Sequence, residues 1–248
     1  MSSGSEEAVY WQPMEFHIGR TLRRTFDVFT RNALAYCLTC ALVQLPNLYF
    51  DFALTQHALQ ALPFAYVYLF YSSIAGALCT ALIVFAAFQD LRGRPVDMAE
   101  SVSRGLRRLV PVLLTSLCVG IGVFLGLIVF TIPGIIFLLM TYCALPVCVV
   151  EGQDPFSSIT RSAQLTKNHR WGLFGVTVII FVVNLILGFA IARLAFPYAY
   201  NATMHALLDY FQSVVVSAFS AVMSVIIYND LRVAREGVDV EEIAAVFD

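Results

Sequence analysis

The sequence predicts an all-α membrane protein with six transmembrane helices, grouped as three units that each consist of a cytoplasmic interfacial helix and a transmembrane hairpin. Hydrophobic residues make up 59% of the 248 positions and charged residues only 13%. Soluble domains carry about 25% charged residues, so this apolar excess requires a bilayer as the solvent. The other two observations are the length of the apolar runs and the distribution of Lys and Arg between them.

Five apolar runs can be compared with the roughly 20 residues that a spanning helix needs. They cover approximately Ala33 to Phe50, Phe64 to Phe88, Leu109 to Val150, Trp171 to Leu194 and Ala206 to Tyr228. The third run would form a helix of roughly 63 Å against a hydrocarbon core of roughly 30 Å, so it must fold back on itself. Pro133 and Gly134 near its middle predict the turn. Because backbone polar groups have no water partners in lipid, we expect six helices.

The cations lie on one side of this predicted membrane path. Of the fifteen Lys and Arg residues, all except Arg193 precede the first span, lie between the second and third or the fourth and fifth, or follow the sixth. The positive-inside rule therefore places both termini in the cytoplasm. Aromatic residues gather near the opposite boundary, where amphipathic rings prefer to lie. Arg193 either pairs with Asp209 or extends to the headgroups.

Three parts of the chain are expected from this pattern. Residues 1–15 form a polar N-terminal tail, residues 16–232 a six-span membrane domain, and residues 233–248 a cytoplasmic C-terminal tail. The first apolar run follows a long Arg-bearing polar stretch and lacks a small-residue cleavage site, so a removable signal peptide is not expected.

Basic stretches precede the first, third and fifth spans and repeat one pattern: a branched residue, an Arg two positions later, a small residue and an apolar one. They are Ile18 to Leu22, Val102 to Leu106 and Ile159 to Ala163. Apolar residues recur at helical spacing in each stretch. Asp97, three residues before Glu100, and Asp154, directly before Pro155, predict helix starts. We expect three repeated units that pack around a shared centre.

Each predicted hairpin returns to the cytoplasm at an acidic residue: Asp90, Glu151 or Asp230. A carboxylate at the membrane edge is costly unless it is solvated or paired. One interpretation is a functional cluster of acids. The interpretation that we favour is structural, with ion pairs to the repeated arginines of the interfacial helices, Arg20, Arg104 and Arg161. Glu151 and Arg161 are the pair that we most expect, because a short turn containing Gly and Pro joins them.

Several short motifs together resemble a known family. They are Ile132-Pro133-Gly134-Ile135-Ile136, Ala144-Leu145-Pro146-Val147, Val150-Glu151-Gly152, the stretch from Ser158 to Thr166, and the stretch from Tyr228 to Asp239. In this order and spacing they resemble a group of bacterial inner-membrane proteins similar to the membrane domain attached to some glycerophosphodiester phosphodiesterases. The resemblance implies a six-helix membrane domain without its own known catalysis. No room remains after Asp248 for a soluble phosphodiesterase barrel, so phosphodiesterase activity is not expected.

The remaining polar residues give little sign of catalysis. The six Cys lie inside spans and are expected to act as small apolar fillers, and the four His are too scattered for a metal site, so no metal or cofactor is expected. A milder polar lining is conceivable in the fifth and sixth spans. Its members would be Asn184, Ser213, Ser217, Ser220 and Ser224, although small residues at helical spacing more often serve helix packing, as Gly122 and Gly126 are expected to do.

These observations predict a non-enzymatic bacterial inner-membrane component that acts through lipid or protein partners. Its basic interfacial helices are expected to contact anionic headgroups at about 1 kcal/mol per well-placed cation. A protein partner or a second copy of the chain would be further partners, and nucleic acid is not expected. The alternative is a passive transporter or channel for a small or lipid-like solute, through the fifth and sixth spans.

Overall fold

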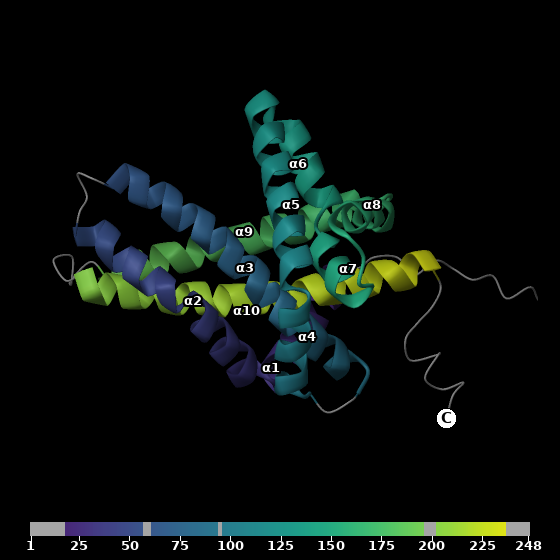
Figure 1. Cartoon of the computed structure of the whole chain (residues 1–248), viewed down its shortest axis with the longest axis horizontal. Helices are drawn as coiled ribbons and strands as arrows, with labels where there is room; N and C mark the ends of the chain where they lie inside the picture. Colours follow the sequence, from purple (N-terminus) through teal and green to yellow (C-terminus); the bar gives the residue numbers. More distant parts are fainter. Residues whose placement is uncertain (1–17, 57–60, 94–95, 196–201, 237–248) are drawn as a thin grey trace, which may run out of the picture.

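The computed structural model describes residues 18–56, 61–93, 96–195 and 202–236, which fold into ten α-helices (Figure 1). Three are formed by the basic stretches, namely α1 (Ile18–Arg31), α4 (Met98–Arg107) and α8 (Pro155–Thr166). The others are α2 (Ala33–Gln56), α3 (Ala61–Leu91), α5 (Leu109–Val129), α6 (Thr131–Met140), α7 (Ala144–Val150), α9 (Arg170–Ala195) and α10 (Ala202–Glu236). Six segments, with α6 and α7 counted as one, are long and apolar enough to cross a membrane. The chain is therefore a multi-pass membrane protein, and the all-α prediction is confirmed.

The basic stretches are helices, as the sequence predicts. The Asp97 carboxylate caps α4 by accepting a hydrogen bond from the Glu100 amide at 3.1 Å. The Asp154 carboxylate caps α8 by accepting from the Ser157 amide at 3.2 Å, with Pro155 in the first turn. Hydrogen bonds from the hydroxyl and the amide of Ser157 hold the pKa of Asp154 below its usual value. Both caps satisfy amides that would otherwise lack a helical partner.

Helix α10 is the centre of the fold. Every residue from 221 to 229 is buried, so the helix is enclosed on all sides over more than two turns. It packs against α1, α2, α3, α7, α8 and α9. Apolar side chains from these helices converge on it, among them Tyr36, Ile83, Val147 and Leu165. A helix that is buried all round carries apolar residues on every face, which is why α10 shows a continuous apolar run rather than a stripe.

The long third apolar run folds back at Phe130, so the predicted turn at Pro133 and Gly134 was wrong by about one helical turn. Phe130 has extended backbone angles, φ −158° and ψ 142°, between α5 and α6. Pro133 lies in the first turn of α6, where its missing N–H would have no helical acceptor. A Cβ on Gly126 would lie 2.8 Å from the Cα of Gly134. The two glycines therefore let the helices of this hairpin approach closely.

A second interruption, which the sequence analysis did not predict, separates α6 from α7 at residues 141–143. Pro146 has no N–H to donate to the carbonyl four residues before it. Ser162 of α8 satisfies neighbouring backbone groups, because its buried hydroxyl donates to the Met140 carbonyl at 2.8 Å and accepts from the Cys143 amide at 3.1 Å. Helix α8 is thereby bonded directly to the interrupted span.

The hairpin of α5 and α6 leaves the bundle that the other long helices form. In Figure 1, α2, α3, α9 and α10 extend toward one side of the molecule, whereas α5 and α6 run at a large angle to them. The hairpin packs on itself and touches α3, α4, α7, α8 and α9. The middle pair of long helices thus departs from the expected arrangement of three units around one centre.

Only one of the predicted domain boundaries, the C-terminal end of the membrane domain, falls within the described residues. Helix α10 continues to Glu236, four residues past the predicted end of the membrane domain at residue 232. The N-terminal tail at residues 1–15 and residues 237–248 of the C-terminal tail lie outside the described residues.

Candidate functional site

The carboxylates predicted at the membrane edge lie in the last turn of α3 (Asp90), directly after α7 (Glu151) and in the C-terminal part of α10 (Asp230). These three helices are in contact with one another. Phe88 of α3 and Tyr228 of α10 are in ring contact, with centroids 6.4 Å apart. The short helices α1, α4 and α8 pack at the same end, as the contacts below show. Every described Lys and Arg other than Arg193 belongs to this part of the molecule. We call it the arginine-rich end.

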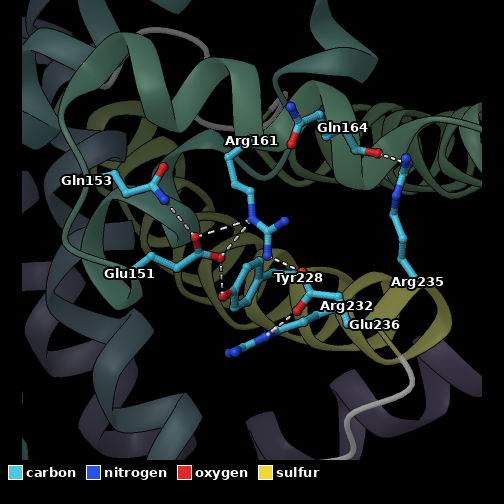
Figure 2. A network of polar contacts seen from close by, with 8 residues as sticks. All are labelled: Glu151, Gln153, Arg161, Gln164, Tyr228, Arg232, Arg235 and Glu236. Atoms are coloured by element: carbon cyan, nitrogen blue, oxygen red, sulfur yellow. Dashed lines mark hydrogen bonds and ion pairs between the residues drawn. The ribbon is translucent and has the colours of Figure 1, made fainter.

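Glu151 is the centre of a hydrogen-bond network that joins α7, α8 and α10 (Figure 2). Its carboxylate accepts from the Tyr228 hydroxyl at 2.9 Å and from the Gln153 amide at 3.1 Å. Arg161 approaches the same carboxylate with Nε 3.3 Å from Oε2. The structure therefore contains the pair that the sequence analysis most expected. With three donors around it, the Glu151 carboxylate is held in place as a structural acceptor.

The network continues along α10 through Glu236. Arg161 also pairs with Glu236, which in turn accepts from Arg232 Nε at 3.1 Å, and Arg235 donates to the Gln164 carbonyl. Burial acts to lower the pKa of Arg161, but the hydrogen bond and charge of Glu236 together with Glu151 outweigh it and raise that pKa above its usual value. Arg161 therefore remains charged and bridges two carboxylates from different elements.

The other two edge acids bind α1. Asp230 accepts from the Thr21 hydroxyl at 2.7 Å and from Arg24 Nη1 at 3.2 Å. Arg20, one of the arginines predicted to pair with the edge acids, lies one turn earlier on α1, and its positive charge acts on Asp230. The described ion pair to Asp230 is that of Arg24. Asp90 is 3.9 Å from Nη1 of Arg31, at the end of α1. Helix α1 is thus bound to the ends of both α3 and α10.

Arg104 does not reach any of the edge acids, and this part of the prediction was wrong. It pairs instead with Glu100 of its own helix, with Nη2 2.5 Å from Oε1. Residues four apart lie on the same helix face, so Glu100 is the nearest carboxylate that Arg104 can pair with. The Arg104 guanidinium also lies over the Phe85 ring, 4.1 Å from its centroid.

Helix α4 and the C-terminal ends of α3 and α7 border a partly open cavity of about 470 Å³, which we call the arginine cavity. Its lining combines four arginines, one carboxylate and an apolar floor: Arg92, Arg104, Arg107, Arg108, Glu151, Phe85, Phe88, Val149, Val150 and Gly152. Planar guanidinium groups donate paired hydrogen bonds that match carboxylate and phosphate oxygens. The chemistry of this lining is therefore suited to binding an anion.

The candidate polar lining of the fifth and sixth spans makes mainly local contacts. Ser213 donates to the Tyr210 carbonyl and Ser224 to the Ala221 carbonyl, both on α10. Asn184 donates to the Ile180 carbonyl on its own helix α9. Ser217 and Ser220 are half-buried on α10, and none of the five lines the arginine cavity. Within the described residues Arg193 and Asp209 form no ion pair.

Residues 109–231 match a family model described as a Domain of unknown function (DUF7847). No curated protein and no solved structure matches the chain. The matched residues contain Glu151, Arg161, Tyr228 and Asp230. They begin directly after Arg108, so the arginines of the arginine cavity all precede the matched segment.

Several residues of this end were missed by the sequence analysis. Tyr228, Arg24 and Glu236 each bond one of the predicted residues, but they come from elements distant in the sequence. Arg24 had a usable signal, since it lies one turn from Arg20 on the same helix face. Gly152 was named in the sequence analysis only as part of a family motif. In the structure it adopts φ +68°, and a Cβ there would lie 2.7 Å from Nη2 of Arg108.

Proposed function

We propose that the protein is a non-enzymatic component of a bacterial inner membrane that acts through the lipids around it. Its arginine-rich end lies in the cytoplasm, where it binds anionic headgroups, and both termini are on that side. The placement of the cations supports this orientation, because Lys and Arg are enriched in cytoplasmic segments of membrane proteins.

The observation that carries the proposal is the mixed apolar and basic surface of α1, α4 and α8, the helices of the basic stretches. Each presents a large apolar side chain to the outside, Phe26 on α1, Leu106 on α4 and Phe156 on α8, exposed by 60%, 54% and 73%. Exposed arginines accompany them, including Arg23 and Arg107. A helix that lies in the membrane interface has this composition, since its apolar side chains enter the bilayer and its cations contact headgroups.

The repeated order of one short helix and two long helical segments supports an origin from three copies of one unit, although the middle hairpin departs from the bundle. The resemblance to the membrane domain of glycerophosphodiester phosphodiesterases belongs to the same proposal and implies no catalysis by this domain. A protein partner or a second copy of the chain would add to the lipid contacts rather than replace them.

Purification in a mild detergent, followed by extraction of the lipids that remain bound, tests the proposal. We expect a higher ratio of anionic to zwitterionic phospholipid than in the membrane from which the protein was taken. The double substitution Arg23→Gln and Lys167→Gln, at exposed positions of the arginine-rich end, should lower that ratio. Arg193→Gln, which removes an exposed cation at the opposite end of α9, is the control and should leave it unchanged. A wild-type ratio equal to that of the membrane would overturn the proposal.

A further inference from the structure

We propose that the arginine cavity is a specific site for the phosphate group of an anionic phospholipid, an inference that rests on the proposed function and assigns its lipid a defined place. The cavity lies between α3, α4 and α7, and its volume of about 470 Å³ falls within the range of small-ligand pockets, roughly 300–1,000 Å³.

Two of the arginines are held in position by aromatic rings at the cavity. The guanidinium carbon of Arg104 is 4.1 Å from the centroid of the Phe85 ring, and that of Arg92 is 4.5 Å from the centroid of Phe88. Stacking on a ring restrains a guanidinium while leaving its N–H groups at the edge of the plane. A ligand therefore meets cations whose side-chain entropy is already reduced.

A third arginine is fixed by the backbone. Arg108 Nη1 donates to the Gly152 carbonyl at 2.9 Å, which uses one of its five N–H donors. Two properties of glycine at position 152 allow this contact. Its φ of +68° is a backbone conformation that disfavours residues with a side chain, and the absence of a Cβ leaves room for the Arg108 guanidinium. Arg107 is exposed and makes no ion pair within the described part of the chain. It is a cation with all of its donors available to a ligand.

The charge balance of the cavity favours an added anion. Glu151 is the carboxylate in the lining, and Arg161 already pairs with it while Tyr228 and Gln153 donate to it. Glu100 offsets the charge of Arg104. Arg107 and Arg108 form no ion pair with any of the described residues. Their charges repel each other across a partly enclosed space, and a phosphate with its multiple acceptor oxygens would relieve that repulsion.

The apolar floor identifies a lipid as the source of the phosphate. Phe85 and Phe88 belong to the last turns of the apolar α3, and Val149 and Val150 end the apolar α7. The arginines thus lie where two apolar segments end, at the level of phospholipid headgroups. A phosphate held by these arginines would place the attached glycerol and acyl chains beside apolar side chains. A soluble phosphate would gain nothing from that floor.

Binding of short-chain phosphatidic acid to the purified full chain in a neutral detergent tests the site, with short-chain phosphatidylcholine and sn-glycerol 3-phosphate as comparisons. We expect saturable binding of phosphatidic acid, weaker binding of both comparisons, and a loss of affinity of roughly tenfold in Arg107→Gln and in Arg108→Lys. The lysine variant keeps the charge and removes the planar fork. Gly152→Ala should also weaken binding, because it displaces Arg108 without changing any charge. Glu100→Gln should strengthen binding, since that carboxylate competes for Arg104.

Arg23→Gln on α1, also an exposed cation of the arginine-rich end, is the matched control and should change the affinity by less than about twofold. Unchanged affinity in Arg107→Gln and Arg108→Lys would overturn the assignment of the site, while an anionic excess among retained lipids would leave the proposed function standing. Tighter binding of glycerol phosphate than of phosphatidic acid would overturn the lipid as the source. Absence of any anionic excess in the wild-type chain would instead overturn the proposed function itself.

Discussion

Replacement of Glu151 by Gln tests whether the network around this carboxylate stabilises the fold. The substitution keeps the size of the side chain and removes its charge. Tyr228, Gln153 and Arg161 all direct donors to the native carboxylate. An amide offers one acceptor oxygen in place of two, and its NH₂ group would face at least one of these donors. We therefore expect E151Q to destabilise the protein.

The size of the expected stability loss depends on how far Glu151 and Arg161 are buried. The Glu151 side chain is 16% exposed and that of Arg161 27%, so the pair is screened less than a surface pair. Arg161 keeps its contact with Glu236, which means that the variant leaves no fully uncompensated charge. Hydrogen bonds to charged groups contribute about 1.5–3 kcal/mol and neutral ones about 0.5–1.5 kcal/mol. E151Q replaces hydrogen bonds to a charged acceptor with hydrogen bonds to a neutral one. After a reduction for the partial exposure of the pair, the difference predicts a loss of about 1–2 kcal/mol in the free energy of unfolding.

The assay is the free energy of unfolding in mixed micelles, followed by tryptophan fluorescence during titration with a denaturing detergent. The matched control is Glu100→Gln, the same chemical change in a pair whose side chains are 41% and 55% exposed. A surface pair at this helical spacing contributes about 0.3–0.5 kcal/mol. Equal losses in the two variants would refute the conclusion that the Glu151 network is a stabilising connection between α7, α8 and α10.

Three further substitutions, each with a control, test contacts between the helices. Gly105→Ala should destabilise the protein by about 1–3 kcal/mol, since a Cβ there would lie 2.9 Å from the Ala81 carbonyl oxygen of α3. Gly76→Ala, which meets nothing within 4 Å, should be neutral or stabilising in the same unfolding assay. Ser162→Ala should destabilise the protein by about 1–3 kcal/mol, because the Met140 carbonyl and the Cys143 amide both lose a buried hydrogen-bond partner. Ser103→Ala, at an exposed position, is the control and should change the stability little. Similar losses in the two variants would contradict this role of Ser162. Tyr210→Phe should cost about 0.6 kcal/mol through loss of its 2.6 Å bond to the Ala41 carbonyl, and an unchanged stability relative to the exposed Tyr49→Phe would show that the bond contributes nothing.

The features that depend on local sequence were predictable, and those that depend on tertiary contacts were not. Length and hydropathy gave the six spans, and Asp97 and Asp154 gave the starts of α4 and α8 because a cap acts within one turn. The turn at Phe130 was displaced from the prediction because Pro is tolerated in the first turn of a helix as well as in a loop.

The ion pairs likewise divide into one that was predictable from local sequence and others that depend on tertiary contacts. Glu151 and Arg161 are ten residues apart and joined by a short turn, so proximity in sequence was enough to pair them. Asp230 lies 206 residues from Arg24, and which side chain of α1 pairs with it depends on how α1 is rotated against α10. That rotation is set by packing, which periodicity alone does not fix. The arginine cavity was missed for a similar reason, because its lining comes from α3, α4 and α7 together.

The most direct test of the six-span topology is the side of the membrane on which Phe130 lies, since the α5 and α6 hairpin runs at a large angle to the other long helices. Alkaline phosphatase and green fluorescent protein can each be joined after Phe130, with fusions after Gln56 and Asn168 as references for the outer and cytoplasmic sides. Six spans with the arginine-rich end in the cytoplasm predict phosphatase activity after Phe130, as after Gln56, and fluorescence after Asn168. Fluorescence without phosphatase activity after Phe130 would mean that this hairpin does not cross the membrane, and it would contradict the topology.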